Sequence, residues 1–241
     1  MKAITIHEFG GIDKLLYEDL EVPKPGNGQV LVKIFASGVN HLDHDLREGI
    51  SGIDVKFPHV LGVEGVGEIV ELGGGVNQSS LGDRVAIHFA QGNPRSDMWL
   101  SGLDGVDFSH GRIGASRWGT HSEYCVAEET SLIDLPENIS YEKGEFPWAA
   151  SGKALIVKAN QGKTKILFDP ETKKILGAAI VGPSAGDLIS EACLAMEMGA
   201  DSEDISLTIH PHPTLGETFA AASEAYSGTI TDLYIPQKRE K

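Results

Sequence analysis

The chain has few of the residues that build disulfide frameworks or metal clusters. Only two cysteines occur among its 241 residues, Cys125 and Cys193, and they lie far apart with no CxxC pair. A disulfide framework or a cysteine-rich metal site is therefore not expected, and both cysteines are interpreted as small buried residues. No apolar run approaches the ~20 residues that a membrane span needs. The opening residues alternate like a strand and show no signal-peptide core, so we expect a cytoplasmic protein without membrane contact.

Positive charge is also scarce. The sequence holds 20 Lys and Arg residues against 35 Asp and Glu residues, which gives a formal net charge of −15. A field of this sign repels phosphate backbones, so nucleic acid is excluded as an expected partner. The charge otherwise indicates only a well-hydrated surface.

The first part of the chain is rich in short strand-like runs separated by Gly and Pro turn signals. These runs are Ala3–His7, Gln29–Ala36, Gly67–Leu72, Arg84–His88 and Ser122–Ala127. Frequent short strands with such punctuation predict a closed or nearly closed all-β domain. A short charged helix is expected near His41–Arg47.

The last part changes character and predicts an α+β domain. Two β-runs, Thr164–Phe168 and Lys174–Val181, flank a turn signal. A helix follows, with Ser184 and Asp187 as its expected capping box and Gly199 as its stop. Its expected apolar face comprises Leu188, Ile189, Ala192, Cys193 and Met196. A second helix is expected from Pro213 to about Tyr226.

Three motifs of the first part resemble the medium-chain dehydrogenase/reductase family, of the zinc-free quinone oxidoreductase type. They are the opening through Pro23–Gly26, the segment Gly38–Asp43, and Gly62–Glu68, which is similar to a Gly-His-Glu motif. The resemblance implies a mainly β, GroES-like barrel over residues 1–142. The segments 119–124 and 135–140 resemble the family's exit from this domain.

The residues that bind zinc in that family are replaced here. Asn40 stands at the position of a cysteine ligand and Val63 at that of a histidine ligand, and neither an amide nor an alkyl side chain substitutes for them. The four cysteine positions of the structural-zinc lobe fall on Asn93, Ser96, Trp99 and Asp107. We therefore predict no metal site.

A redox cofactor has no complete binding segment in this sequence. The nearest Gly-rich stretch, Gly65-Val66-Gly67, lies in a strand-like run without a third glycine or a following helix, so it is not expected to bind a nucleotide. In zinc-free reductases the residue matching Asn40 lies near the nicotinamide cleft, which makes Asn40 a candidate cofactor contact by resemblance. The alternative is that Asn40 only satisfies a turn.

A second candidate metal cluster is His41 and His44 with Asp43 and Asp45. The two histidines are three positions apart on the expected short helix. A polar helix of this kind is more often a solvated face, so the sequence favours that interpretation.

From Phe146 onward the chain resembles the dimerisation domain of dihydrolipoamide dehydrogenase. The resemblance rests on Phe146–Ala154, Gly177–Gly182, Ala195–Asp201 and, most specifically, Thr208–Glu217, which reads TIHPHPTLGE. It implies an α+β pyridine nucleotide-disulfide oxidoreductase dimerisation domain over residues 143–241. It also implies a homodimer through residues 145–241.

One motif in this region contains a histidine and a glutamate at a spacing that suits proton transfer. His212 precedes Pro213, and Glu217 is placed to accept a hydrogen bond from one ring nitrogen and to raise the basicity of the other. By resemblance, His212 and Glu217 are the catalytic acid/base pair, acting on the flavin and disulfide of the other subunit. The alternative is that the pair only organises the dimer interface, because the two cysteines here lack the CxxxxC spacing.

The sequence thus predicts a hybrid of two oxidoreductase-derived domains, dimeric and without complete catalysis in one chain. FAD and NAD(P) are implied by the resembling families only. One alternative is an oxidoreductase whose His–Glu pair completes a flavoprotein partner's site. The other is a zinc-independent NADPH quinone reductase-like protein. Whether the chain is an enzyme, and whether a natural fusion or a constructed chimera joined its parts, stay open at this point.

Overall fold

The computed structural model describes residues 1–136 and 139–233, and it divides the chain into two compact units, residues 1–137 and 138–241. The expected two-domain organisation is thereby confirmed. Glu142, the last residue of the predicted first domain, is the first residue of a strand in the second unit. Glu137, Asn138 and residues 234–241, which the sequence analysis assigned to the domain exit and the dimerisation domain, lie outside the described residues.

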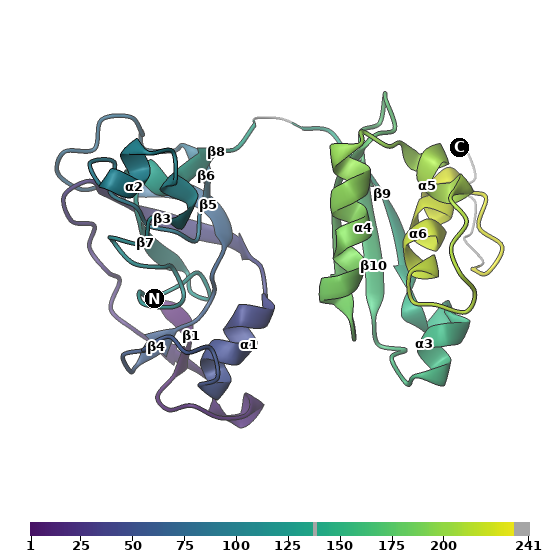
Figure 1. Ribbon diagram of the computed structural model, residues 1–241, viewed down its shortest axis with the longest axis horizontal. Coiled ribbons are helices and arrows are strands. Elements are labelled where there is room, and N and C mark those ends of the chain that lie inside the picture. The colour runs from purple at the N-terminus through teal and green to yellow at the C-terminus, as the bar shows by residue number, and fades with distance from the viewer. Residues whose placement is uncertain (137–138, 234–241) are drawn as a thin grey trace, which may run out of the picture. The chain divides into compact units, whose positions relative to one another are not determined.

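The first unit is mainly β-structure (Figure 1). Its strands are β1 (Lys2–Ile6), β2 (Leu16–Asp19), β3 (Gln29–Ser37), β4 (His59–Val60), β5 (Gly65–Leu72), β6 (Arg84–Ile87), β7 (Tyr124–Glu128) and β8 (Leu132–Asp134). Its helices are α1 (His41–Glu48) and α2 (Asp97–Leu100), with short 3-10 turns η1 (Ile12–Lys14), η2 (Asp104–Val106) and η3 (Glu129–Ser131). The strand runs and the helix predicted from the sequence are confirmed to within about two residues.

Two antiparallel sheets organise this unit. The larger has the order β7-β3-β5-β6-β8 and the smaller the order β2-β1-β4. Among the described residues β7 and β8 do not pair, so hydrogen bonding does not close the larger sheet into the expected barrel. The lack of a side chain at Gly67 permits the close approach of β5 to β3, because a Cβ there would lie 2.1 Å from the Lys33 carbonyl oxygen.

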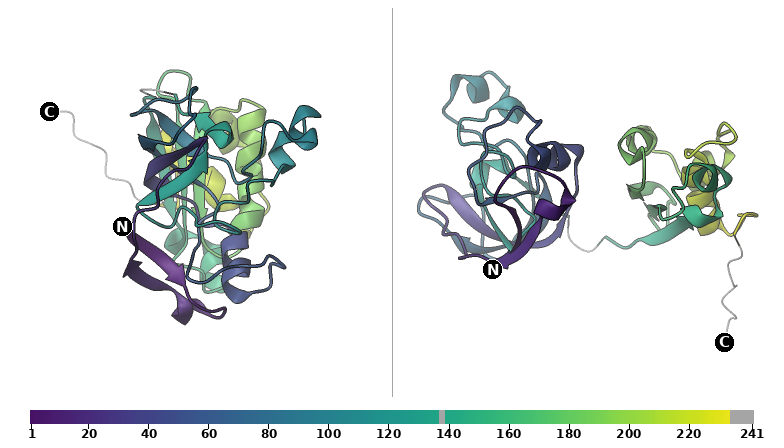
Figure 2. Two further views of the ribbon diagram at one scale, coloured as in Figure 1. Left: turned by 90° about the vertical axis from the view of Figure 1, so that its left-hand side faces the viewer. Right: turned by 90° about the horizontal axis from the view of Figure 1, so that it is seen from below.

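Two clusters of buried side chains fill the unit. One lies on the larger sheet and includes Val32, Ile69 and Val85. The other joins Ile6 of β1 to Leu46 of α1, so it fixes α1 beside β1 and β4 (Figure 1). The loop that carries α2 stands away from the larger sheet (Figure 2).

The second unit contains a three-stranded antiparallel sheet with helices. Its elements are β9 (Glu142–Pro147), η4 (Trp148–Ala150), α3 (Gly152–Ile156), β10 (Lys163–Phe168), β11 (Ile175–Val181), α4 (Ala185–Glu197), α5 (Ser202–Leu207) and α6 (Glu217–Ser227). The strand order is β11-β10-β9. Helix α6 packs on β9 and β10, and α4 packs on β11. The predicted α+β character is confirmed.

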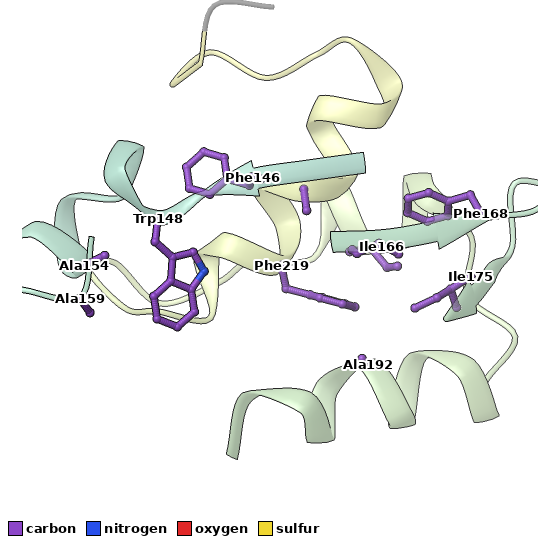
Figure 3. Packing of buried hydrophobic residues seen from close by; sticks show 12 residues of the cluster. Phe146, Trp148, Ala154, Ala159, Ile166, Phe168, Ile175, Ala192 and Phe219 are labelled. Atoms are coloured by element: carbon purple, nitrogen blue, oxygen red, sulfur yellow. The ribbon is translucent and has the colours of Figure 1, made fainter. Parts of the chain in front are cut away.

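Trp148 is the largest buried side chain of this unit. Its indole is fully buried and donates a hydrogen bond from Nε1 to Thr164 Oγ1 over 2.9 Å. Figure 3 shows it as part of the buried cluster to which Phe219 of α6 and Ala192 of α4 also belong. Gly162 and Gly182 admit the ring, because a Cβ at either position would lie within 2.3 Å of an indole carbon.

Two details of α4 differ from the prediction. Ser184 precedes the helix in a left-handed conformation (φ 60°) and its side chain forms no capping hydrogen bond, so the predicted capping box is wrong. An extended conformation is needed for a serine to cap the first turn. Cys193 is exposed and Met196 is 44% exposed, whereas Ala192 faces the core. The side chains of α4 that pack on the core are Leu188, Ile189, Ala192 and Ala195, and Cys193 and Met196 lie outside this stripe.

The start of the last helix also differs. Helix α6 begins at Glu217 and not at Pro213, because Thr214 lies in a loop and donates its N–H to Glu217 Oε2 over 2.7 Å. Gly216 precedes the helix as its N-cap in right-handed helical conformation. In the part of the chain that the structure describes, no helix is long and apolar enough to cross a membrane.

Candidate functional site

The first candidate site is a cavity of about 730 Å³ in the first unit. It lies between the end of β3, the start of β5, the start of α1 and the end of β6. The lining residues are Ala36, Ser37, Gly38, Asn40, Leu42, Val63, Glu64, Gly65, Val66, Ala86, Ile87, His88, Phe89 and Ile133. The structure thus brings Asn40 and Val63, the two replaced zinc-ligand positions, to the wall of one cavity.

Asn40 forms two hydrogen bonds beside this cavity. Its backbone N–H donates to Asp43 Oδ2 over 2.8 Å and so caps the first turn of α1. Its side-chain Nδ2 donates to Glu64 Oε1 over 2.8 Å. Asp43 is buried, and its Oδ1 accepts the N–H of Gly62 over 2.9 Å, which ties the helix start to the segment before β5. Asn40 therefore does more than satisfy a turn, because its amide also holds the Glu64 carboxylate.

This donor set does not fit a zinc ion. With an amide at Asn40 and an alkyl group at Val63, neither replaced position offers a zinc ligand, and the neighbouring Glu64 already accepts a hydrogen bond from Asn40. The pair Gly65 and Gly67 lies inside β5, where the glycines permit close strand packing and form no phosphate loop.

The four positions of the zinc-lobe pattern carry a hydrogen-bonded cluster instead. Asp107 is buried, accepts the N–H of Asn93 over 3.1 Å and that of Ser109 over 2.9 Å, and also accepts the Ser96 hydroxyl. Hydrogen bonds hold the pKa of Asp107 well below its ordinary value, although burial opposes this effect. The bond from the Ser96 hydroxyl contributes most, and those from Ser109 and Asn93 add to it. The Trp99 N–H donates to Ser96 Oγ over 3.0 Å. The Asp107 carboxylate therefore holds this loop together by hydrogen bonds, at the positions where the family pattern has four cysteines.

The second candidate site is the loop before α6 in the second unit. His212 Nδ1 lies 2.7 Å from Glu217 Oε1, and Glu217 Oε2 accepts the Thr214 N–H. Burial raises the pKa of Glu217, but the hydrogen bonds from Thr214 and His212 outweigh it and lower the pKa overall. Glu217 therefore stays ionised, and its acceptance of the Nδ1 proton leaves the lone pair on Nε2.

His212 presents that nitrogen to solvent. Its side chain is 79% exposed, and Nε2 forms no hydrogen bond with residues 1–136 or 139–233. The structure thus brings the two predicted catalytic residues together with the geometry of an acid/base pair. It places Asn40 in the first unit, at a site of its own.

A third residue of this loop was not predicted from the sequence. His210 Nδ1 lies 2.8 Å from the Thr208 carbonyl oxygen, and Nε2 lies 2.5 Å from Glu191 Oε1 on α4. The Glu191 hydrogen bond raises the pKa of His210 against the opposing effect of partial burial. His210 was visible in the motif, but Glu191 lies on another helix, and only the tertiary fold pairs them.

Comparison with known proteins matches the two units to different families. The alcohol dehydrogenase GroES-like domain matches residues 26–137, and the pyridine nucleotide-disulphide oxidoreductase dimerisation domain matches residues 134–223. Each unit resembles one of two oxidoreductase families. The predicted resemblances are confirmed at this level, and both matches include residues 134–137.

Individual relatives agree with this division. The dihydrolipoyl dehydrogenase of Haemophilus influenzae is 50% identical over 122 residues, which are 51% of this chain and 26% of that protein. The enzyme of the same name from Buchnera aphidicola is 56% identical over 96 residues, 40% of this chain and 20% of that protein.

The solved structures point to the other family. An NAD-dependent alcohol dehydrogenase superposes with a TM-score of 0.54 and 33% identity, covering 65% of this chain and 46% of that one. The alcohol dehydrogenase of Aeropyrum pernix gives a TM-score of 0.54 and 31% identity, with 58% and 41% covered. The chain therefore spans about a quarter of its sequence relatives and less than half of these structures.

Proposed function

We propose that this protein is an oxidoreductase-derived homodimer which pairs through its second unit and does not complete a redox cycle as a single chain. The observation that carries the proposal is the His212–Glu217 pair. Its hydrogen bond orders the imidazole, yet the imidazole is 79% exposed. An ordered base that faces solvent needs a reacting group from another molecule or subunit.

Exposed apolar side chains near this loop support self-association. Ile209 is 95% exposed and Leu207 is 72% exposed, and both lie within three residues of His210 in the sequence. On α4, Leu194 and Met198 are 63% and 76% exposed, one turn apart on the side away from Ala192. Apolar side chains gathered in one region of a surface mark interfaces, and a second copy supplies a self-complementary cover.

Sedimentation of the purified chain tests this proposal. We expect a dimer at micromolar concentration, with no visible flavin absorbance and no cofactor detected by mass spectrometry. A monomer at that concentration contradicts the dimer. His212→Ala is the second arm: weaker dimerisation with no lost activity supports an interface role for the pair.

An alternative is that the pair serves a flavoprotein partner. In this case His212 supplies or accepts a proton at a partner's flavin–disulfide site, with Glu217 holding the ring. The specific observation that favours it is that Nε2 of His212 has no hydrogen-bond partner among the described residues. A yellow preparation, or flavoprotein that co-purifies and is lost with His212→Ala, supports this alternative over the inactive dimer.

A further alternative assigns the first unit to a zinc-independent quinone reductase-like role. It rests on the cavity of about 730 Å³, where Asn40 and Glu64 are among the polar residues that a nicotinamide ring could contact. A thermal shift of the first unit with NADPH that is lost in Asn40→Ala supports it. Because no described glycine-rich turn receives a pyrophosphate, only ring contacts are expected from this chain.

A further inference from the structure

The outer face of helix α1 gathers side chains of the kind that bind transition metals. The helix runs from His41 to Glu48, with Asn40 before it and Gly49 in left-handed conformation (φ 78°) after it. Leu46 is buried, so the opposite side of the helix faces solvent. That exposed side carries His41, His44, Asp45 and Glu48, at i, i+3, i+4 and i+7.

Three donor atoms on this face converge. His44 Nδ1 lies 3.2 Å and His41 Nε2 lies 3.6 Å from Asp45 Oδ1, and the ligand atoms of the three residues all lie within 4.8 Å of one another. The imidazole rings are stacked, with centroids 5.5 Å apart and an interplanar angle of 26°. Among residues 1–136 and 139–233 this is the one group of three or more such side chains at that spacing.

Two of these three separations already suit a zinc ion. With zinc bonded to nitrogen and oxygen at about 2.0–2.1 Å, ligand atoms at the corners of a tetrahedron lie about 3.3 Å apart. The two distances to Asp45 Oδ1 are already close to that value. Only the distance between the two imidazole nitrogens has to shorten, and His41, at 89% side-chain exposure, has room to turn.

Glu48 supplies the outer support that metal-binding histidines usually have. Its Oε1 lies 3.2 Å from Nε2 of His44. A proton on Nε2 that is donated to Glu48 leaves the Nδ1 lone pair directed at Asp45 and His41. Carboxylate–histidine–metal arrangements use this same fixing of the tautomer.

Asp43, which the sequence groups with the two histidines, is excluded as a ligand. It is buried and both of its oxygens accept backbone N–H groups, from Asn40 and Gly62. The sequence favours a solvated face here because it shows neither the convergence at Asp45 nor the role of Glu48.

We propose that His41, His44 and Asp45 form a surface site for a divalent transition metal, with Glu48 orienting His44. Two imidazoles and one carboxylate select a borderline ion such as Zn²⁺, Co²⁺ or Ni²⁺ over the hard ions Mg²⁺ and Ca²⁺, which take oxygen ligands. Water completes the coordination. The site lies on the solvent side of α1 and is separate from the replaced ligand positions Asn40 and Val63.

Calorimetric titration of ZnCl₂ into the tag-free, chelator-treated full chain tests the site. We expect saturation at one zinc per chain, with at least a tenfold weaker Kd in both His44→Gln and Asp45→Asn. Glu48→Ala should weaken binding by about 10–100-fold, and Glu48→Gln, which keeps an acceptor oxygen, should restore most of it. Cobalt added in place of zinc should give visible absorption bands that zinc then removes.

A matched control is available in the same unit. His7 Nε2 lies 2.7 Å from Glu18 Oε1, which makes a surface histidine–carboxylate pair with no third ligand in the described residues. His7→Gln should leave zinc affinity unchanged. Circular dichroism melts of each variant establish that the fold persists. No saturable heat with the wild type, or equal affinity in wild type and His44→Gln, overturns the proposal.

Discussion

His210 and Glu191 join the loop before α6 to helix α4 through a contact of 2.5 Å between Nε2 and Oε1. The other ring nitrogen faces the Thr208 carbonyl oxygen, so both nitrogens have acceptors and the protonated ring satisfies both. The contact with Glu191 ties the segment that leads to His212 to helix α4.

Removing the Glu191 charge should reveal a pH-dependent loss of stability. The hydrogen bond from Glu191 raises the folded-state pKa of His210, so the pair stabilises the fold fully below the ordinary histidine pKa of about 6.5. That contribution is lost as the pH rises through the folded value. We expect Glu191→Gln to lower the free energy of unfolding of the second unit by about 1 kcal/mol at mildly acidic pH. Urea unfolding at several pH values measures it, and an equal loss at alkaline pH contradicts it.

Trp148→Ala should destabilise the second unit strongly. The substitution removes a fully buried indole and its hydrogen bond to Thr164. Because the ring is bordered by Gly162 and Gly182, which have no side chains, we expect the cavity that it leaves to stay empty. Losses of about 3–5 kcal/mol are typical for such truncations. Calorimetry should show the transition of one unit shifted and that of the other in place. A small shift would mean that the ring is not central to the core.

Asp107→Asn should loosen the loop that carries α2. The pKa of Asp107 is lowered chiefly by the Ser96 hydroxyl, so the carboxylate stabilises the folded state above its ordinary pKa of about 4 and loses that effect as the pH falls through the folded value. The variant should therefore exchange the amide hydrogens of Asn93 and Ser109 faster at neutral pH. This difference should shrink at low pH. Unchanged exchange at neutral pH would show that the amide oxygen replaces the carboxylate.

Ile209→Asp should weaken the proposed dimer. An isoleucine that is 95% exposed beside His210 is expected to be buried by the second copy, and a carboxylate there opposes that burial. Sedimentation should show a shift toward monomer of at least tenfold in Kd. Ile12→Asp is the matched control, since Ile12 is 80% exposed in the first unit. Equal effects of the two substitutions would argue against a specific interface.

Local patterns predicted the elements better than their ends. Strand β5 and helix α1 follow directly from alternation and from the charge pattern of the segment. The start of α6 was predicted too early, because the competing bond from Thr214 to Glu217 depends on a loop conformation that the sequence does not display. β9 was missed, because its pairing with β10 is a contact between distant residues.

The candidate sites show the same limit. The His212–Glu217 pair is five residues apart, and the motif alone predicted it. Glu191 and Glu64 were not assigned roles, because each acts on a residue at least 19 positions away. Spacing along the chain predicts partners within one helix or loop, and tertiary pairs require the fold.

Each buried cluster draws all of its residues from one unit. The cluster around Trp148 lies wholly within the second unit, and those around Ile69 and Leu46 lie wholly within the first. Among residues 1–136 and 139–233, no buried cluster therefore contains side chains from both units. We expect each unit to keep its buried cluster, and so to fold, when a different domain replaces the other unit.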